Sequence, residues 1–143
     1  EFTNSFGTFA REAKKNAEHR NYYSVYPFPP ANIYMLPDKT MVFEFALAGY
    51  SDSDVSLEFQ GEYMVLSAKA PEQTVDNENV IFFNRRLKYS DIPAQKYFVP
   101  EDKFDRENAK AVYKHGILKV TVPPREEVRS AEGVKIEIVN EDE

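Results

Sequence analysis

Apolar and polar residues alternate along the middle of the chain with the two-residue period of β-strands. In residues 41–48 the large apolar side chains fall on every second position, between smaller residues and Glu44, and in 55–60 apolar and polar side chains alternate, so each run presents one face for burial. Turn-forming residues, such as His115-Gly116, separate these runs. Strands are predicted at residues 32–36, 41–48, 55–60, 63–70, 80–87, 95–99, 109–114 and 117–122.

Short strands at this spacing, with no long helix between them, predict an all-β fold. The expected architecture is an immunoglobulin-like antiparallel β-sandwich. A chain of 143 residues can bury one core of this kind and carry additional arms. We therefore expect three parts: an N-terminal arm (1–31), the sandwich domain (32–123) and a C-terminal extension (124–143).

The strand predicted at 80–87 lies inside the long connection between Pro71 and Pro93. An apolar strand in a protruding loop needs another sheet edge to satisfy its backbone amides and carbonyls. Exchange of this strand with a second subunit is the natural solution, near residues 32–36 of that subunit. The residues expected to take part in the exchange are Ile81, Phe82, Phe83, Arg85 and Arg86.

The N-terminal arm has phenylalanines at Phe2, Phe6 and Phe9, spaced as on one side of a helix that begins near Asn4 or Ser5. A helix of about 13 residues is marginal on its own, so it needs something to pack against. Two interpretations stay open. The arm lies on its own domain, or it forms part of an oligomer core or a surface that binds other proteins.

The C-terminal extension begins with a polar segment that cannot bury enough apolar area to order itself. It then reaches a short apolar peptide in which Val134, Ile136 and Ile138 fall on one side of an extended strand. Such a peptide can add to an exposed sheet edge. The alternative is that residues 134–139 form the last strand of their own sandwich.

Composition argues against several classes of function. The chain has no cysteine, only two histidines (His19 and His115) and five scattered glycines, so thiolate zinc sites, histidine-based catalysis and phosphate-binding loops lack support. A net charge of −6 argues against nucleic-acid binding, and no apolar run is long enough for a membrane span. We expect a cytoplasmic non-enzyme without a metal or cofactor, although a pair of catalytic carboxylates from distant strands stays possible.

Several motifs together resemble the small heat-shock proteins. The segment Ala111–Pro123 around Gly116 is similar to the family's A-x-x-x-N-G-x-L-x-V-x-x-P, and Ile136-Glu-Ile138 to its I-x-I tail. Phe45–Tyr50 and Tyr97–Pro100 resemble two further family elements. The resemblance implies an alpha-crystallin domain and an ATP-independent holdase chaperone. It also implies homo-oligomers built from dimers, unfolding client proteins as partners, and ATP-driven chaperones downstream.

The resemblance also implies a groove that accepts the tail of another subunit, between strands 55–60 and 109–114. The candidate groove residues are Leu57, Phe59, Ala111 and Val112, although the sequence does not fix which alternating face lines the groove. Gln95 stands where the family usually has an interface arginine, which puts that ion pair in doubt. Pro93 is expected to lie outside its strand, since proline cannot donate to a ladder.

Two rival functions come from other classes. A monomeric CS-type co-chaperone adaptor would have the related sandwich but no need for the inserted 80–87 strand or the apolar tail. A carbohydrate- or surface-binding β-sandwich module would usually display tryptophan or tyrosine platforms. The chain has nine tyrosines and no tryptophan.

Overall fold

The computed structural model describes residues 26–72, 75, 78–127 and 136–140, and within them it contains seven β-strands. Two short 3-10 turns, Asp52–Asp54 and Arg106–Asn108, lie just before the strands that begin at Val55 and Lys110. The strands are β1 (Ala31–Met35), β2 (Met41–Ala46), β3 (Val55–Gln60), β4 (Tyr63–Ala68), β5 (Ile92–Phe98), β6 (Lys110–Lys114) and β7 (Ile117–Val122).

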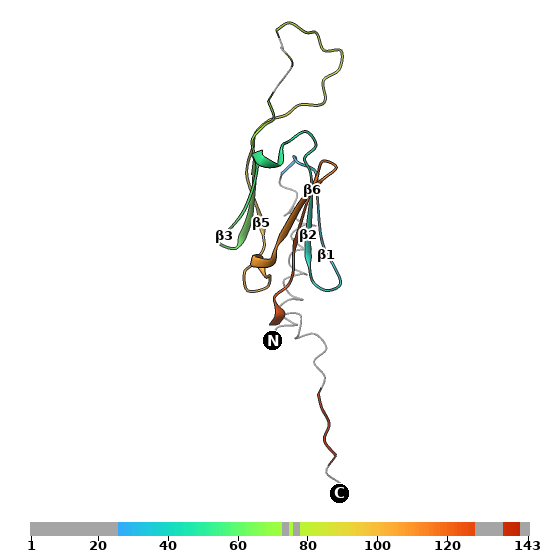
Figure 1. Ribbon diagram of the computed structural model, residues 1–143, viewed down its shortest axis with the longest axis vertical. Coiled ribbons are helices and arrows are strands. Elements are labelled where there is room, and N and C mark those ends of the chain that lie inside the picture. The colour runs from blue at the N-terminus through green and yellow to red at the C-terminus, as the bar shows by residue number, and fades with distance from the viewer. Residues whose placement is uncertain (1–25, 73–74, 76–77, 128–135, 141–143) are drawn as a thin grey trace.

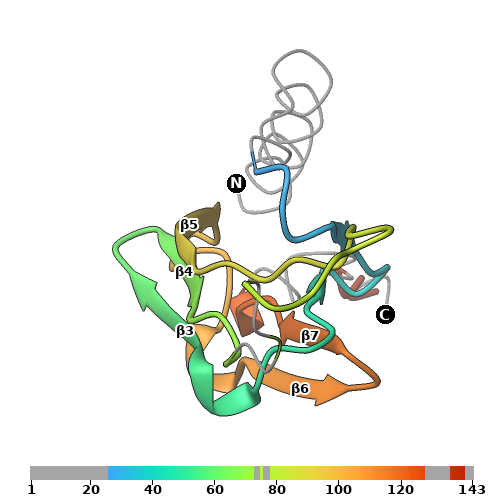
Figure 2. The same cartoon turned by 90° about the horizontal axis from the view of Figure 1, so that it is seen from above.

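The strands form two antiparallel sheets that face each other, which confirms the predicted all-β sandwich (Figures 1 and 2). One sheet has the order β1-β2-β7-β6, and the other has the order β3-β4-β5. Within the described residues, β1, β6, β3 and β5 are therefore edge strands. β3 and β6 bound the same side of the sandwich (Figure 2).

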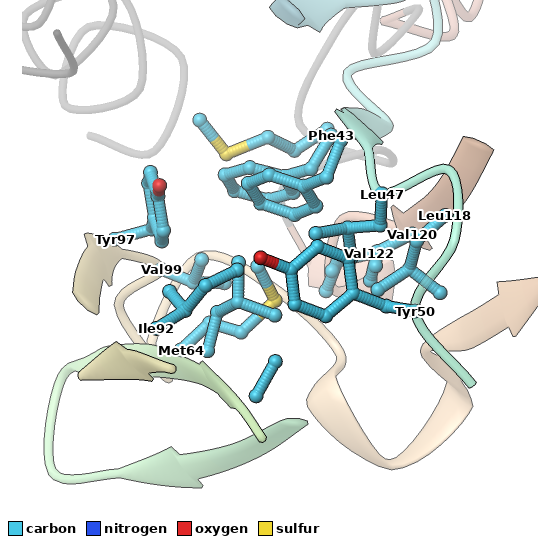
Figure 3. Packing of buried hydrophobic residues seen from close by; sticks show 14 of the residues in the cluster. Phe43, Leu47, Tyr50, Met64, Ile92, Tyr97, Val99, Leu118, Val120 and Val122 are labelled. Atoms are coloured by element: carbon cyan, nitrogen blue, oxygen red, sulfur yellow. The ribbon is translucent and has the colours of Figure 1, made fainter. Parts of the chain in front are cut away.

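The core lies between the sheets and is built from the alternating residues that the sequence pattern selects (Figure 3). Phe43 and Phe45 from β2 meet Tyr97 from β5 edge to face, at ring-centroid distances of 5.8 and 5.3 Å. Leu66 from β4 is fully buried beside them. Each such side chain contributes roughly 1.5–3 kcal/mol when it leaves water. These contacts across the sheets hold the sandwich together.

The turn between β6 and β7 consists of His115 and Gly116, as predicted. Both residues have positive φ angles, 55° and 76°. A two-residue hairpin turn with positive φ at both positions matches the right-handed twist of the strands it joins. A Cβ on Gly116 would lie 3.0 Å from the Ala48 side chain, so the turn also packs closely against the end of β2.

The strand predicted at 80–87 is absent from the chain. Residues 78–91 are described throughout and contain no strand; they form the return half of a loop that projects beyond one end of the sandwich (Figure 1). The physical reason is the one that makes an isolated strand unstable: no sheet edge of the same chain pairs with its backbone. Its apolar side chains are left largely in solvent.

The prediction that β5 begins after Pro93 is wrong. The strand begins at Ile92, which pairs with Ala68, and the register shifts between Leu66 and Ala68. Proline is tolerated in edge strands and at bulges because no ladder hydrogen bond is lost there. Pro93 meets both conditions, since β5 is an edge strand and the irregularity lies opposite it.

The base of the projecting loop is fixed to the sandwich. The Tyr50 hydroxyl donates a hydrogen bond of 2.8 Å to the Ser90 carbonyl, and the Ala70 amide donates one of 2.7 Å to the Asp91 carboxylate. The Tyr89 ring lies over Gly49, which has a φ of 92°; a Cβ on this glycine would come within 2.5 Å of the ring. The loop therefore leaves the sandwich from a defined position.

Candidate functional site

The predicted groove corresponds to the side of the sandwich between the edge strands β3 and β6. Leu57 and Phe59 on β3 are half-buried and pack against the core. Ala111 on β6 pairs with Val120, whose side chain is buried in the core, so Ala111 shares this inward face. The structure thus brings three of the four candidate groove residues to the same side.

Val112, the fourth candidate, lies on the opposite face of β6. It pairs with Lys119 and is 57% exposed on the outside of the sheet. Because successive strand residues point to opposite faces, Ala111 and Val112 cannot both line the groove. The residues that do share the inward face with Ala111 are Ala109 and Tyr113, which pack against the core. Leu118 and Val120 are alternate apolar residues of β7, and the β6 residues on the same face as their partners could have been identified from this alternation.

Tyr113 fastens the edge strand β6 to the end of β2. Its hydroxyl lies within hydrogen-bonding distance of two backbone carbonyls, those of Leu47 and Tyr50, the second at 2.8 Å. Burial, followed by the nearby Asp52 carboxylate, raises the pKa of Tyr113. The phenol therefore stays protonated and remains a donor, which keeps the β6 side of the groove in place.

One end of the groove is a hollow of about 320 Å³ lined by Phe59 and charged residues. The Arg106 guanidinium lies over the Phe59 ring, 5.0 Å from its centroid, and donates to the Gly61 carbonyl at 2.5 Å. This arrangement holds the half-buried Phe59 of β3 against the turn that precedes β6. No sequence pattern points to Arg106, because its contact joins segments 45 residues apart.

A carboxylate links this hollow to the start of the C-terminal extension. Glu101 lies 3.4 Å from Arg106 and 3.9 Å from Arg125, which follows β7. The Arg125 amide also donates to the Lys103 carbonyl at 3.0 Å. Exposed ion pairs stabilise little, at most about 1 kcal/mol each. Their effect here is positional: the extension leaves the sandwich beside the hollow.

The apolar residues of the tail are exposed. Ile136 and Ile138 are 82% and 91% accessible, and Val139 is also exposed. Residues 136–140 form no strand with the sandwich. The interpretation of this segment as the last strand of its own sandwich is therefore wrong for residues 136–139; Val134 lies outside the described residues.

The residues predicted for strand exchange lie on the projecting loop. Phe83 is completely exposed and Ile81 is 85% exposed, which is unusual for such large apolar side chains. The Arg85 guanidinium lies 4.4 Å from the centroid of the Phe82 ring, and Arg86 is exposed beside it. The five residues thus lie together on one segment, where Arg85 is partly covered and the other four are exposed.

The outer face of β1 carries a small polar cluster. Asn32 and Tyr34 each donate to the carboxylate of Glu44 on β2, at 3.1 and 3.0 Å. These hydrogen bonds, with a smaller contribution from Lys119, lower the pKa of Glu44. They order the outer face of the sheet next to the free edge of β1.

Gln95 is buried and does not act as a surface substitute for an arginine. Its side-chain amide donates a 2.7 Å hydrogen bond to the Phe28 carbonyl and accepts one of 2.8 Å from the Tyr97 hydroxyl. The neighbouring Lys96 amide donates to the Tyr26 hydroxyl at 2.9 Å. This position therefore attaches the segment before β1 to β5.

The remaining sequence predictions concern the arm and general chemistry. Phe2, Phe6, Phe9 and the helix predicted from Asn4 or Ser5 lie outside the described residues. Within the described part of the chain, no group of three or more histidine, cysteine or carboxylate residues could hold a metal ion. A search of the same residues finds no helix long and apolar enough to cross a bilayer.

Comparisons with known proteins agree on one family. The model of the Hsp20/alpha crystallin family matches residues 34–139. A probable 15 kDa heat shock protein from Leptospira interrogans is 26% identical over 113 residues, which cover 77% of this chain and 72% of that protein.

Solved structures show the same fold. A small heat-shock protein from Xylella fastidiosa has a TM-score of 0.60 at 18% identity, over 78% of this chain and 96% of that one. A small heat shock protein from Synechococcus phage S-ShM2 has a TM-score of 0.57 at 19% identity, over 79% and 98% of the two chains. The family match covers both sheets of the sandwich. This chain therefore belongs to the Hsp20/alpha crystallin family, the small heat-shock proteins, a family of stress-response chaperones.

Proposed function

We propose that this protein is an ATP-independent holdase that binds unfolding client proteins and prevents their aggregation in the cytoplasm. The observation that carries the proposal is the exposure of large apolar side chains outside the core, with Phe83 fully accessible and Ile138 nearly so. Large apolar side chains gathered on exposed segments, as on the projecting loop and again on the tail, mark sites of association. Family membership supports the chaperone role.

Assembly begins with a dimer in this proposal. The loop segment 80–87 of one subunit pairs with the free edge of β1 in another, which satisfies its backbone and buries Ile81, Phe82 and Phe83. Arg85 and Arg86 on the same segment then lie at the dimer interface. The projecting position of the loop supports this exchange, because the segment already extends away from its own sandwich (Figure 1).

Dimers then assemble through the tail. Residues 124–143 act as a tether, and Val134, Ile136 and Ile138 dock between β3 and β6 of another subunit. Leu57, Phe59 and Ala111 supply apolar contact there. The high exposure of both isoleucines and the half-buried state of the β3 side chains support the match. Burial of each isoleucine is worth roughly 1.5–3 kcal/mol before ordering costs, so the contact is reversible.

Clients bind where these contacts open. A groove that has released its tail offers apolar surface to exposed segments of unfolding proteins. The N-terminal arm, residues 1–31 with Phe2, Phe6 and Phe9, offers a second such surface. Bound clients later pass to ATP-driven chaperones. The sandwich, residues 32–123, is the scaffold and performs no catalysis.

A heated model client provides the direct test. Light scattering by a thermally aggregating enzyme should fall as this protein is added in stoichiometric amounts, with no nucleotide present. Bovine serum albumin at the same mass concentration serves as the control for crowding. Unchanged scattering at a several-fold molar excess would refute the holdase proposal.

A further inference from the structure

The outer face of β6 carries an alternating pattern of charge and apolar surface. Lys110, Val112 and Lys114 point to this face and are all exposed, since Val112 pairs with the outward Lys119. Lys119 lies next to Glu44, which is already engaged by two hydrogen bonds. The described residues provide no ion pair for Lys110 or Lys114. An apolar centre thus lies between two lysines on an edge strand.

The tail has the complementary pattern on one of its sides. If Ile136 and Ile138 face the groove, the alternation of an extended strand turns Glu137, Val139 and Glu141 the other way. These three residues place a valine between two acids at two-residue spacing, just as β6 places Val112 between Lys110 and Lys114. Glu141 lies outside the described residues, and its side follows from the sequence alone.

We propose that the tail of a neighbouring copy adds to the free edge of β6 as a parallel strand in one register, a proposal that rests on the proposed tail tether. Its outward residues then match those of β6 one for one: Glu137 on Lys110, Val139 on Val112 and Glu141 on Lys114. Opposite charges and apolar pairs at neighbouring strand positions stabilise sheets. In this register the exposed Val112 side chain contacts Val139 of the tail.

Side-chain size selects the parallel direction. With Val139 beside Val112, a parallel tail brings Ile136 and Ile138 next to Ala109 and Ala111, whose small side chains leave room in the groove. An antiparallel tail in the same register would instead place the isoleucines next to Tyr113 and His115. Tyr113 already fills its side of the groove and is bonded to backbone carbonyls, so this direction is crowded.

Charge selects β6 over the facing edge strand β3. The outward residues of β3 are Ser56, Glu58 and Gln60, and Glu58 pairs with Val65 on the outside of its sheet. A tail added to β3 would bring Glu137 or Glu141 beside this acid, and like charges at neighbouring strand positions are destabilising. The same tail beside β6 meets lysines.

The test is a set of charge reversals in the full-length protein, read as the dissociation constant of the oligomer by analytical ultracentrifugation. Each single variant, Lys110→Glu or Glu137→Lys, should weaken assembly about two- to fivefold, the range for exposed ion pairs. The double variant K110E/E137K should regain most of the loss. Salt at about 1 M shortens the screening length to about 3 Å and should remove the difference between variants.

Further variants distinguish an error in the proposed strand register from a failure of tail docking itself. The variant Lys69→Glu reverses an exposed lysine away from β6 and should not couple to Glu137→Lys. If assembly is restored by K114E/E137K and not by K110E/E137K, the tail is antiparallel. If neither lysine couples to Glu137, the tail docks on another edge. Either result overturns the proposal. If the variant I136G/I138G also leaves the oligomer mass unchanged, the tether itself is refuted.

Discussion

The side-chain amide of Gln95 lies 2.7 Å from the backbone carbonyl of Phe28, and the two residues are 67 positions apart in the chain. This hydrogen bond closes the sandwich at the point where the chain enters β1. Gln95 also accepts from the buried Tyr97 hydroxyl, so one buried side chain pairs with a group from the entry segment and a group from the core.

Replacement of Gln95 by alanine should therefore destabilise the fold. The buried Tyr97 hydroxyl would lose its partner, at about 1–3 kcal/mol for a buried unsatisfied group, and the hydrogen bond to the Phe28 carbonyl would be lost as well. The free energy of unfolding, measured in urea, is the readout. Gln60→Ala is the matched control, because Gln60 is exposed on β3 and its loss should change stability by less than about 0.5 kcal/mol. Equal effects of the two variants would contradict this role.

Gly49→Ala should disturb the base of the projecting loop. The new Cβ would come within 2.5 Å of the Tyr89 ring, at a residue with a φ of 92°. Positive φ costs an alanine about 1–2 kcal/mol, and displacement of Tyr89 adds to this. Gly61→Ala separates the two effects, since Gly61 also has positive φ but has nothing within 4 Å of the added atom. We expect faster proteolysis of residues 71–91 in the first variant only.

Glu44 should titrate below its ordinary pKa of 4.5, because Asn32 and Tyr34 donate to its ionised form. A carboxylate with a lowered pKa stabilises the fold above that ordinary value, and the contribution disappears as the pH falls through the lowered one. Carboxyl chemical shifts in NMR can follow this titration. The double variant N32A/Y34F should return the midpoint towards 4.5; a midpoint that stays low would mean another cause.

Replacement of Ile136 and Ile138 by glycine should reduce the particle towards dimers. The change removes roughly 1.5–3 kcal/mol of apolar burial for each side chain that docks. Light scattering gives the mass directly. The conservative double variant I136V/I138V keeps branched apolar side chains and should retain most of the assembly, whereas loss of mass in this variant to the same extent would argue against apolar docking.

Deletion of residues 78–88 should give monomers. The deletion removes Ile81, Phe82 and Phe83 but keeps Tyr89, Ser90 and Asp91, which fasten the loop to the sandwich. Native mass spectrometry at micromolar concentration measures the state, and circular dichroism checks that the sheets remain. Persistent dimers with intact sheets would contradict strand exchange.

The fold could be predicted from the sequence because its core follows a simple alternation. Phe43, Phe45 and Leu66 fall on every second position of their strands, and all three are buried. Residues 80–87 are also apolar, as the core strands are, but they form no strand in the single chain. An apolar composition does not by itself supply a sheet edge to pair with. Pro93 was misplaced for a related reason: its tolerance depends on a bulge in β4–β5 pairing that no local pattern reveals.

The candidate site could be predicted only in part. Leu57, Phe59 and Ala111 lie on the expected side, whereas Val112 does not, because the parity of β6 is fixed by its pairing with β7. The contacts of Arg106 and Gln95 were missed since each joins segments more than forty residues apart. Such contacts depend on the three-dimensional arrangement, and the sequence pattern carries no trace of them.

The exposed aromatic loop has a consequence for how the molecule can change over time. Phe83 and its neighbours contribute nothing to the interior, and the interior residues around Phe43 contribute nothing to the loop surface. Substitutions in one set therefore leave the other intact. Natural variation can retune how strongly subunits and substrates adhere while the folded scaffold is inherited unchanged.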